Sequence, residues 1–187
     1  MVILKPASLA IMKLLGADRI DHGYTIIDNP ELIKEAKASD MHFAVVPTNS
    51  YYLRTLSDEE WAIKHPVRKM VELGLKVFPN SDDPTMHHIS ISESWLLMHN
   101  WLDFTLPQLR KMLENSIEAA WVTDEQKAIW KKEWLKEFDR LSVDLPPVLK
   151  PQKRFLKNRR PNRYWVRILE RTIRDKPVAM NCTKVFP

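Results

Sequence analysis

The chain has 187 residues, 44% of them hydrophobic and 28% charged, which is the balance of an ordinary globular domain and excludes wholesale disorder. Only three glycines occur, which excludes a glycine-rich phosphate loop, and the lone Cys182 excludes an internal disulfide or a thiolate zinc cluster. The net charge of +5 is unevenly spread: residues 151–187 hold 11 Lys and Arg against 2 Asp and Glu, and residues 1–150 hold 18 against 22.

The first half of the chain alternates amphipathic helical patterns with short apolar runs. Each run is preceded by one helix, and Gly74 stands where the third helix should end. This alternation predicts βα units and a parallel sheet whose strands are buried on both faces. The expected helix and strand pairs are 7–15 with 19–20, 30–38 with 43–46, and 66–73 with 76–78.

Beyond Pro84 the pattern is helical. Helices are expected at residues 92–101 and 106–121, and a capping-box pattern at Thr123 opens another that runs to about Leu141. In that last helix Trp130, Trp134 and Phe138 recur every four residues. Large apolar groups at helical spacing predict a packing stripe rather than a cofactor site.

The C-terminal region differs in composition from the rest. Residues 145–151, with three prolines, predict a linker, so we expect a domain at residues 1–145 and a basic tail at 146–187. A short basic helix is expected at 164–174. Interleaved aromatic and basic residues in this tail suit single-stranded nucleic acid, but charge runs usually stay solvated, so we do not expect nucleic acid as the partner.

No apolar run reaches the roughly 18 residues that span a bilayer, and the N-terminus does not fit a signal peptide. We therefore expect a cytoplasmic protein with no membrane partner.

Polar residues follow each predicted strand: His22 the first, Asn49 and Ser50 the second, Asp82 and Asp83 the third. The carboxyl ends of parallel strands share one edge, where α/β proteins build active sites. Two adjacent carboxylates there favour a divalent metal, because a cation relieves their repulsion. Each piece also has an ordinary alternative: a solvated Asp turn, a structural histidine, or helix capping by the polar pair after the second strand.

The order of these pieces resembles one family. RIDHG at residues 19–23, VPTNS at 46–50, His65 with Pro66, and NSDDP at 80–84 are similar to the adenosine deaminase family of metal-dependent amidohydrolases, over residues 6–141. The resemblance implies an α/β fold: the C-terminal portion of a (β/α)8 barrel, about three parallel strands, followed by several helices. It further implies an enzyme in which a zinc-activated water attacks C6 of a purine and releases ammonia.

The resemblance also implies residue roles. His22 would act on the attacking water as the catalytic histidine, Asp82 would ligate the single zinc ion, and Asp83 would hydrogen-bond a purine ring nitrogen. The family's His-x-His pair and His-Ala-Gly-Glu motif, which supply the other ligands and the catalytic glutamate, are not found in this chain. We therefore expect the chain to be inactive alone, as the C-terminal part of a longer product or as one of two chains that complete the barrel.

The substrate is expected to be adenosine. Residues 47–50 follow the adenosine-type pattern, whereas Asp21 before His22 is typical of the adenine branch, so adenine or another aminopurine stays open. A non-catalytic barrel remnant with a basic binding tail is the other alternative. His87 and His88 lie near the expected metal without an assigned role. His42 and His99 are expected to be structural.

Overall fold

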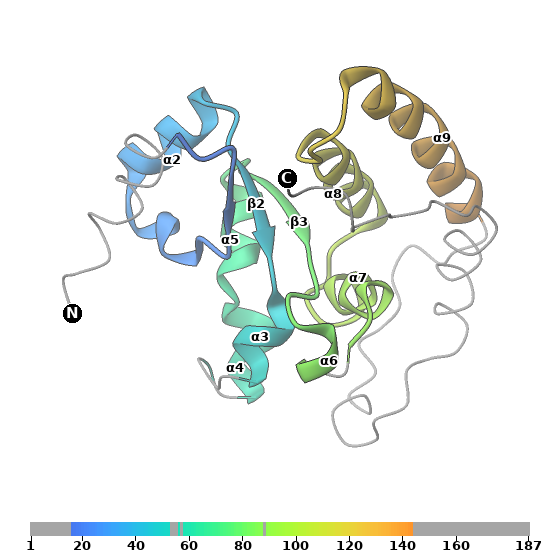
Figure 1. The fold of residues 1–187 in the computed structure, drawn as a ribbon. Helices are drawn as coiled ribbons and strands as arrows, with labels where there is room; N and C mark the ends of the chain where they lie inside the picture. Colours follow the sequence, from blue (N-terminus) through green and yellow to red (C-terminus); the bar gives the residue numbers. More distant parts are fainter. Residues whose placement is uncertain (1–15, 53–55, 57, 88, 144–187) are drawn as a thin grey trace. The chain divides into compact units, whose positions relative to one another are not determined.

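The computed structural model describes residues 16–52, 56, 58–87 and 89–143 (Figure 1). All of these lie in the first of the two units into which the chain divides, residues 1–152. The helices expected at 7–15 and 164–174, the linker at 145–151 and the basic tail lie outside the described residues.

Three parallel strands form the sheet, in the order β1 (Arg19–Asp21), β2 (His42–Val45) and β3 (Lys76–Pro79). This confirms the predicted parallel sheet, with strand bounds that differ from the prediction by one residue at most. In the register, Arg19, His42 and Lys76 are aligned across the three strands at the end where each strand begins.

The crossovers between strands are helical, as parallel pairing requires. The 3-10 helix η1 (Tyr24–Asp28) and α2 (Pro30–Ala38) join β1 to β2. Helix α2 begins where predicted because Asn29 accepts backbone hydrogen bonds from Glu31 and Leu32 and a proline follows it.

Three helices join β2 to β3: α3 (Pro47–Tyr52), α4 (Asp58–Lys64) and α5 (Pro66–Glu72). Helix α5 was predicted, and Gly74 follows its C-cap residue in the left-handed region, with φ of 74°. Helices α3 and α4 were not predicted, because six or seven residues are too few to display a helical period.

Four helices follow β3: α6 (Pro84–His87), α7 (Ile91–Asn100), α8 (Leu106–Glu118) and α9 (Asp124–Ser142). The capping boxes that begin α7 and α8 are complete. Of the capping box expected at α9, the structure gives one half, in which the Thr123 side chain accepts the Gln126 N–H. In α9 the rings of Trp130 and Trp134 stack with centroids 4.9 Å apart, and Phe138 packs against the core. The packing interpretation of this stripe is confirmed.

Burial differs between the strands. All four residues of β2 are buried and Phe43 is fully enclosed, as predicted, whereas β1 is half-exposed. The prediction that every strand is buried on both faces is thus wrong for β1, because within the described residues it pairs with β2 alone.

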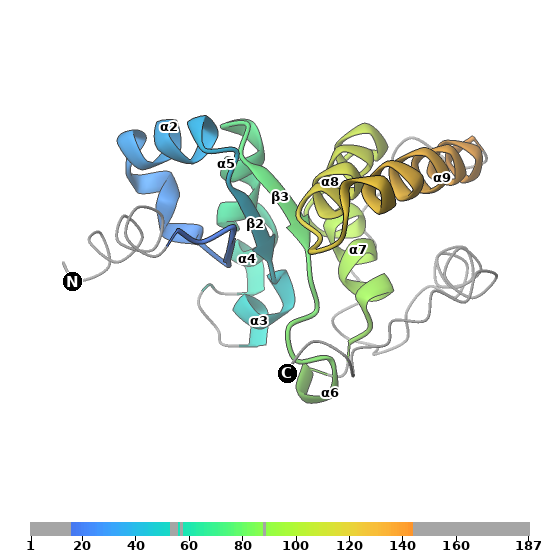
Figure 2. The ribbon, with the colours of Figure 1, turned by 45° about the horizontal axis from the view of Figure 1, so that its top comes forward.

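The far edge of β3 lies against α8 (Figures 1 and 2). The Asn115 amide donates a 3.0 Å hydrogen bond to the Val77 carbonyl, and the ring of Pro79 leaves no N–H to satisfy further along the strand. Within the described residues no helix is both long and apolar enough to cross a membrane.

Candidate active site

The loops after the strands begin in register at the carboxyl edge of the sheet. The ladder continues past the strands, because the His22 N–H donates to the Ala44 carbonyl at 2.9 Å and the Asn80 N–H donates to the Val45 carbonyl at 2.8 Å. These bonds fix where the polar loops leave the sheet.

Two of the expected site residues have an uncommon backbone conformation. His22 and Asp82 have φ of 63° and 56°, in the left-handed region that costs about 1–2 kcal/mol for a residue with a Cβ. Gly23, with φ of 62°, extends this turn, and a Cβ there would lie 2.7 Å from the Phe43 ring. Such outliers persist where the fold imposes them, and they concentrate at functional sites.

His22, Asn49 and Asp82 converge from the three strand ends. The Asn49 amide donates to Asp82 Oδ2 at 2.8 Å, and His22 Nε2 lies 3.9 Å from the same oxygen. Asp82 Oδ1 accepts no hydrogen bond within the described residues. Both the imidazole and the carboxylate are partly exposed, so the pair is open to a ligand.

The other expected residues do not join this group. Asp83 is exposed and forms no hydrogen bond or ion pair with a described residue. Ser50 is buried and donates to the Pro47 carbonyl at 2.8 Å, away from Asp82. Asn49 and Ser50 lie inside α3, so neither caps it. His88 and the side chain of His87 lie outside the described residues.

A buried histidine supports the loop after β2. His65 Nδ1 accepts the Val67 N–H, so Nε2 carries the proton and donates to Ser50 Oγ at 2.6 Å. The Ser50 hydroxyl in turn donates a hydrogen bond to the Pro47 carbonyl. Burial, with the charge of Arg68, lowers the pKa of His65 to about 4, so the ring is neutral at pH 7.

Tyr24 packs between the buried His65 and the partly exposed His22. Its ring packs edge-on against both His22 and His65, with centroids 5.9 and 5.0 Å away, and its hydroxyl accepts the Val46 N–H at 2.9 Å. Burial raises the pKa of Tyr24, so the phenol stays protonated. Sequence reasoning missed Tyr24, and its position two residues after His22 was the only signal available.

The donor types at this edge fit zinc. A carboxylate and an imidazole nitrogen are both common zinc ligands, and catalytic zinc usually takes three protein ligands and one water. Among the described residues of the carboxyl edge, two such groups lie close to each other, Asp82 and His22, and they form no cluster of three. They therefore fit part of a zinc site and do not complete one.

A family model described as adenosine deaminase matches residues 7–134. The chain belongs to this family. The predicted family is thereby confirmed, and with it membership in a family of deaminating hydrolases.

Similar proteins carry related names. An uncharacterized deaminase of Schizosaccharomyces pombe is 38% identical over 60% of this chain and 32% of its own length. An adenine deaminase of Rhodopseudomonas palustris is 30% identical over 63% of this chain and 34% of its own length. The chain thus spans about a third of the length of these relatives.

A solved structure supports the predicted fold. A zinc-bound amidohydrolase from Burkholderia ambifaria matches with a TM-score of 0.69 and 51% identity, over 72% of this chain and 37% of the other. The three strands and following helices therefore correspond to part of an amidohydrolase barrel, as expected.

Proposed function

We propose that this chain supplies part of the active site of a zinc-dependent deaminase that hydrolyses the 6-amino group of an aminopurine and releases ammonia. The observation that carries the proposal is the meeting of His22, Asn49 and Asp82 at the carboxyl edge, in a chain of this family. The remaining zinc ligands and a general acid/base would come from outside these 187 residues, from a longer product or a second chain.

Asp82 is the proposed metal ligand. Asn49 holds Oδ2 and so fixes the carboxylate plane, which leaves Oδ1 available. Zinc bound there would supply Lewis-acid polarisation and make water a nucleophile near neutral pH. The amide acts as an outer support of the kind that orients ligating carboxylates.

His22 is the proposed catalytic histidine. Its Nε2 can take a proton from the attacking water, and the neighbouring Asp82 carboxylate would stabilise the resulting imidazolium. Tyr24 packs against the ring and limits its rotation. Asp83, exposed beside them, is proposed to hydrogen-bond a ring nitrogen and orient the purine.

Adenosine is the proposed substrate, on the pattern of residues 47–50 and the family description. Adenine is the second candidate, because Asp21 precedes His22 and a relative is named as an adenine deaminase. The ratio of kcat/KM for the two purines in the complete enzyme separates them: a higher value for adenine would reject the first candidate.

The test compares two neighbouring carboxylates in the complete enzyme. Asp82→Ala should remove zinc and lower kcat by 10³-fold or more, whereas Asp83→Ala should retain zinc and raise KM or lower kcat. Asn49→Ala should weaken zinc retention by roughly 10–100-fold. Asp28→Ala, at another exposed aspartate, is the matched control. If Asp82→Ala retained full zinc content and full rate, the proposal would be wrong.

A further inference from the structure

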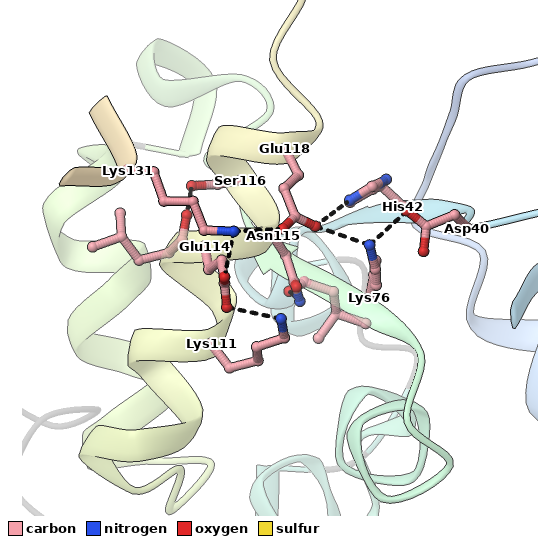
Figure 3. Close-up of polar contacts among 11 residues, drawn as sticks. Asp40, His42, Lys76, Lys111, Glu114, Asn115, Ser116, Glu118 and Lys131 are labelled. Atoms are coloured by element: carbon pink, nitrogen blue, oxygen red, sulfur yellow. Dashed lines mark hydrogen bonds and ion pairs between the residues drawn. The ribbon is translucent and has the colours of Figure 1, made fainter. Parts of the chain in front are cut away.

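A second group of potential metal ligands lies at the amino edge of the sheet, opposite the proposed active site. Asp40 precedes β2, His42 begins it, and Glu118 ends α8 (Figure 3). One potential ligand atom from each residue lies within 4.8 Å of the others. The register places Lys76 beside His42 at this edge.

The imidazole of His42 points to a missing ligand. Its side chain is only 9% exposed, and Nε2 is buried with no hydrogen-bond partner in the described part of the chain. The facing carboxylate atom, Glu118 Oε2, is 3.6 Å away, which is too long for a hydrogen bond. Buried polar atoms are almost always satisfied, so an orphaned nitrogen aimed at a carboxylate requires an explanation.

The spacing and chemistry fit a zinc-class ion. Tetrahedral zinc holds its ligands at about 2.0–2.2 Å, which places neighbouring donor atoms roughly 3.4 Å apart. His42 Nε2 and Glu118 Oε2 already have nearly this separation. One imidazole with two carboxylates favours zinc, cobalt or nickel over magnesium or calcium, which prefer all-oxygen sites. Burial and the charge of Lys76 lower the pKa of His42, so the ring is in the neutral, ligating form.

The Lys76 ammonium lies between the two carboxylates, where the proposed metal ion would bind. This ammonium lies 2.6 Å from Asp40 and 2.9 Å from Glu118 Oε2, while Lys131 binds the other oxygen, Oε1, at 3.2 Å. Lysine carries its charge on a flexible four-carbon stem, so a bound metal could displace this ammonium. Asp40 is exposed, which gives an ion a route from solvent.

We propose that Asp40, His42 and Glu118 form a binding site for a divalent ion of the zinc class, in which the metal replaces the Lys76 ammonium between the carboxylates. The fourth ligand would be water. The bound metal would join the start of β2 to the end of α8, so its effect would be structural. This site is separate from the carboxyl edge and does not depend on the proposed deaminase function.

The experiment is equilibrium dialysis of the full 187-residue chain against Zn²⁺ at pH 7, with thermal unfolding followed in parallel. His42→Gln should weaken zinc binding at least tenfold and abolish the zinc-dependent rise in Tm. Lys76→Met should strengthen binding at least tenfold, because it removes the competing cation. Lys111→Met is the control and should change neither, because among the described residues Lys111 forms its ion pair with Glu114 and not with Asp40 or Glu118. All variants are made on Asp82→Asn, which removes the carboxylate proposed to bind zinc at the other edge.

Two results would overturn the proposal: zinc binding of the same strength in the parent and His42→Gln, or no gain in Lys76→Met. If circular dichroism shows that His42→Gln does not fold, Asp40→Asn replaces it. Asp40 is exposed, and asparagine tolerates its left-handed backbone, so this variant should fold. The affinity of this variant for zinc should fall at least tenfold, and an unchanged affinity would reject the site.

Discussion

Polar side chains at the two edges of the sheet differ in backbone conformation, exposure and pairing. At the carboxyl edge the partly exposed His22 and Asp82 lie on left-handed backbone. The Asp82 carboxylate accepts a hydrogen bond from the Asn49 side-chain amide, and the His22 ring packs against Tyr24. At the amino edge Lys76 and Glu118 belong to a network of ion pairs with Asp40 and Lys131. The carboxyl edge has left-handed backbone at two partly exposed site residues, which is the combination expected of a reactive site. At the amino edge the left-handed residue is Asp40, whose carboxylate is paired with Lys76.

The largest expected effect is on the turn that positions the carboxyl edge. Gly23→Ala combines a left-handed Cβ with a contact 2.7 Å from Phe43, so it should lower the free energy of unfolding by about 2–5 kcal/mol. Gly16→Ala is the matched control, with φ of 58° and no described atom within 4 Å of the added Cβ, and should cost about 1–2 kcal/mol. Urea unfolding of both variants tests this, and equal losses would refute the role of the close approach.

The next effect is acid sensitivity beneath the same edge. The pKa of His65 is about 4 when folded and about 6.5 when unfolded, so the unfolded chain binds more protons between these values. The contribution of neutral His65 to the free energy of unfolding should therefore be fully present above pH 6.5. It should be lost as the pH falls toward 4, which lowers the free energy of unfolding by up to about 3 kcal/mol. His65→Gln should flatten this part of the curve. The same slope in parent and variant would exclude His65 as its source.

The smallest effect concerns the amino edge. Burial alone would raise the pKa of Glu118, but hydrogen bonds from Lys76 and Lys131 outweigh it and hold the pKa at about 2. This contribution to stability is present above pH 4.5 and is lost as pH falls toward 2. Lys76→Met should raise the pKa of Glu118, measured by carboxyl NMR, and lower the free energy of unfolding by roughly 1–2 kcal/mol. An unchanged pKa would mean that Lys131 alone sets it.

Local chemistry explains which elements could be predicted. Helices α2 and α8 begin where expected because Asn29 and Thr105 cap them and a proline follows. Helices α3 and α4 are too short to show a period. The half-exposure of β1 follows from its charged ends, Arg19 and Asp21, and from its pairing with β2 alone among the described residues, and only the first of these is visible in the sequence.

The candidate site divides in a similar way. The positions of His22 and Asp82 after strands placed them at one edge, and the structure brings them within 3.9 Å. The hydrogen bond from Asn49 to Asp82 joins residues that are 33 positions apart in the sequence, and no local pattern predicts it. The packing of Tyr24 against His65 and the tautomer of His65 likewise depend on burial and hydrogen-bond partners, which only the structure gives.

The sequence by itself determined the family, the parallel βα order and the edge that carries the polar loops, because strand spacing, capping residues and short motifs are local. The tertiary structure decided the contacts: Asn49 on Asp82, Asn115 on the edge of β3, and Glu118 facing His42. These pairs are between 33 and 76 residues apart along the chain. Such separations become contacts only when the sheet register and the packing of α8 fix both partners.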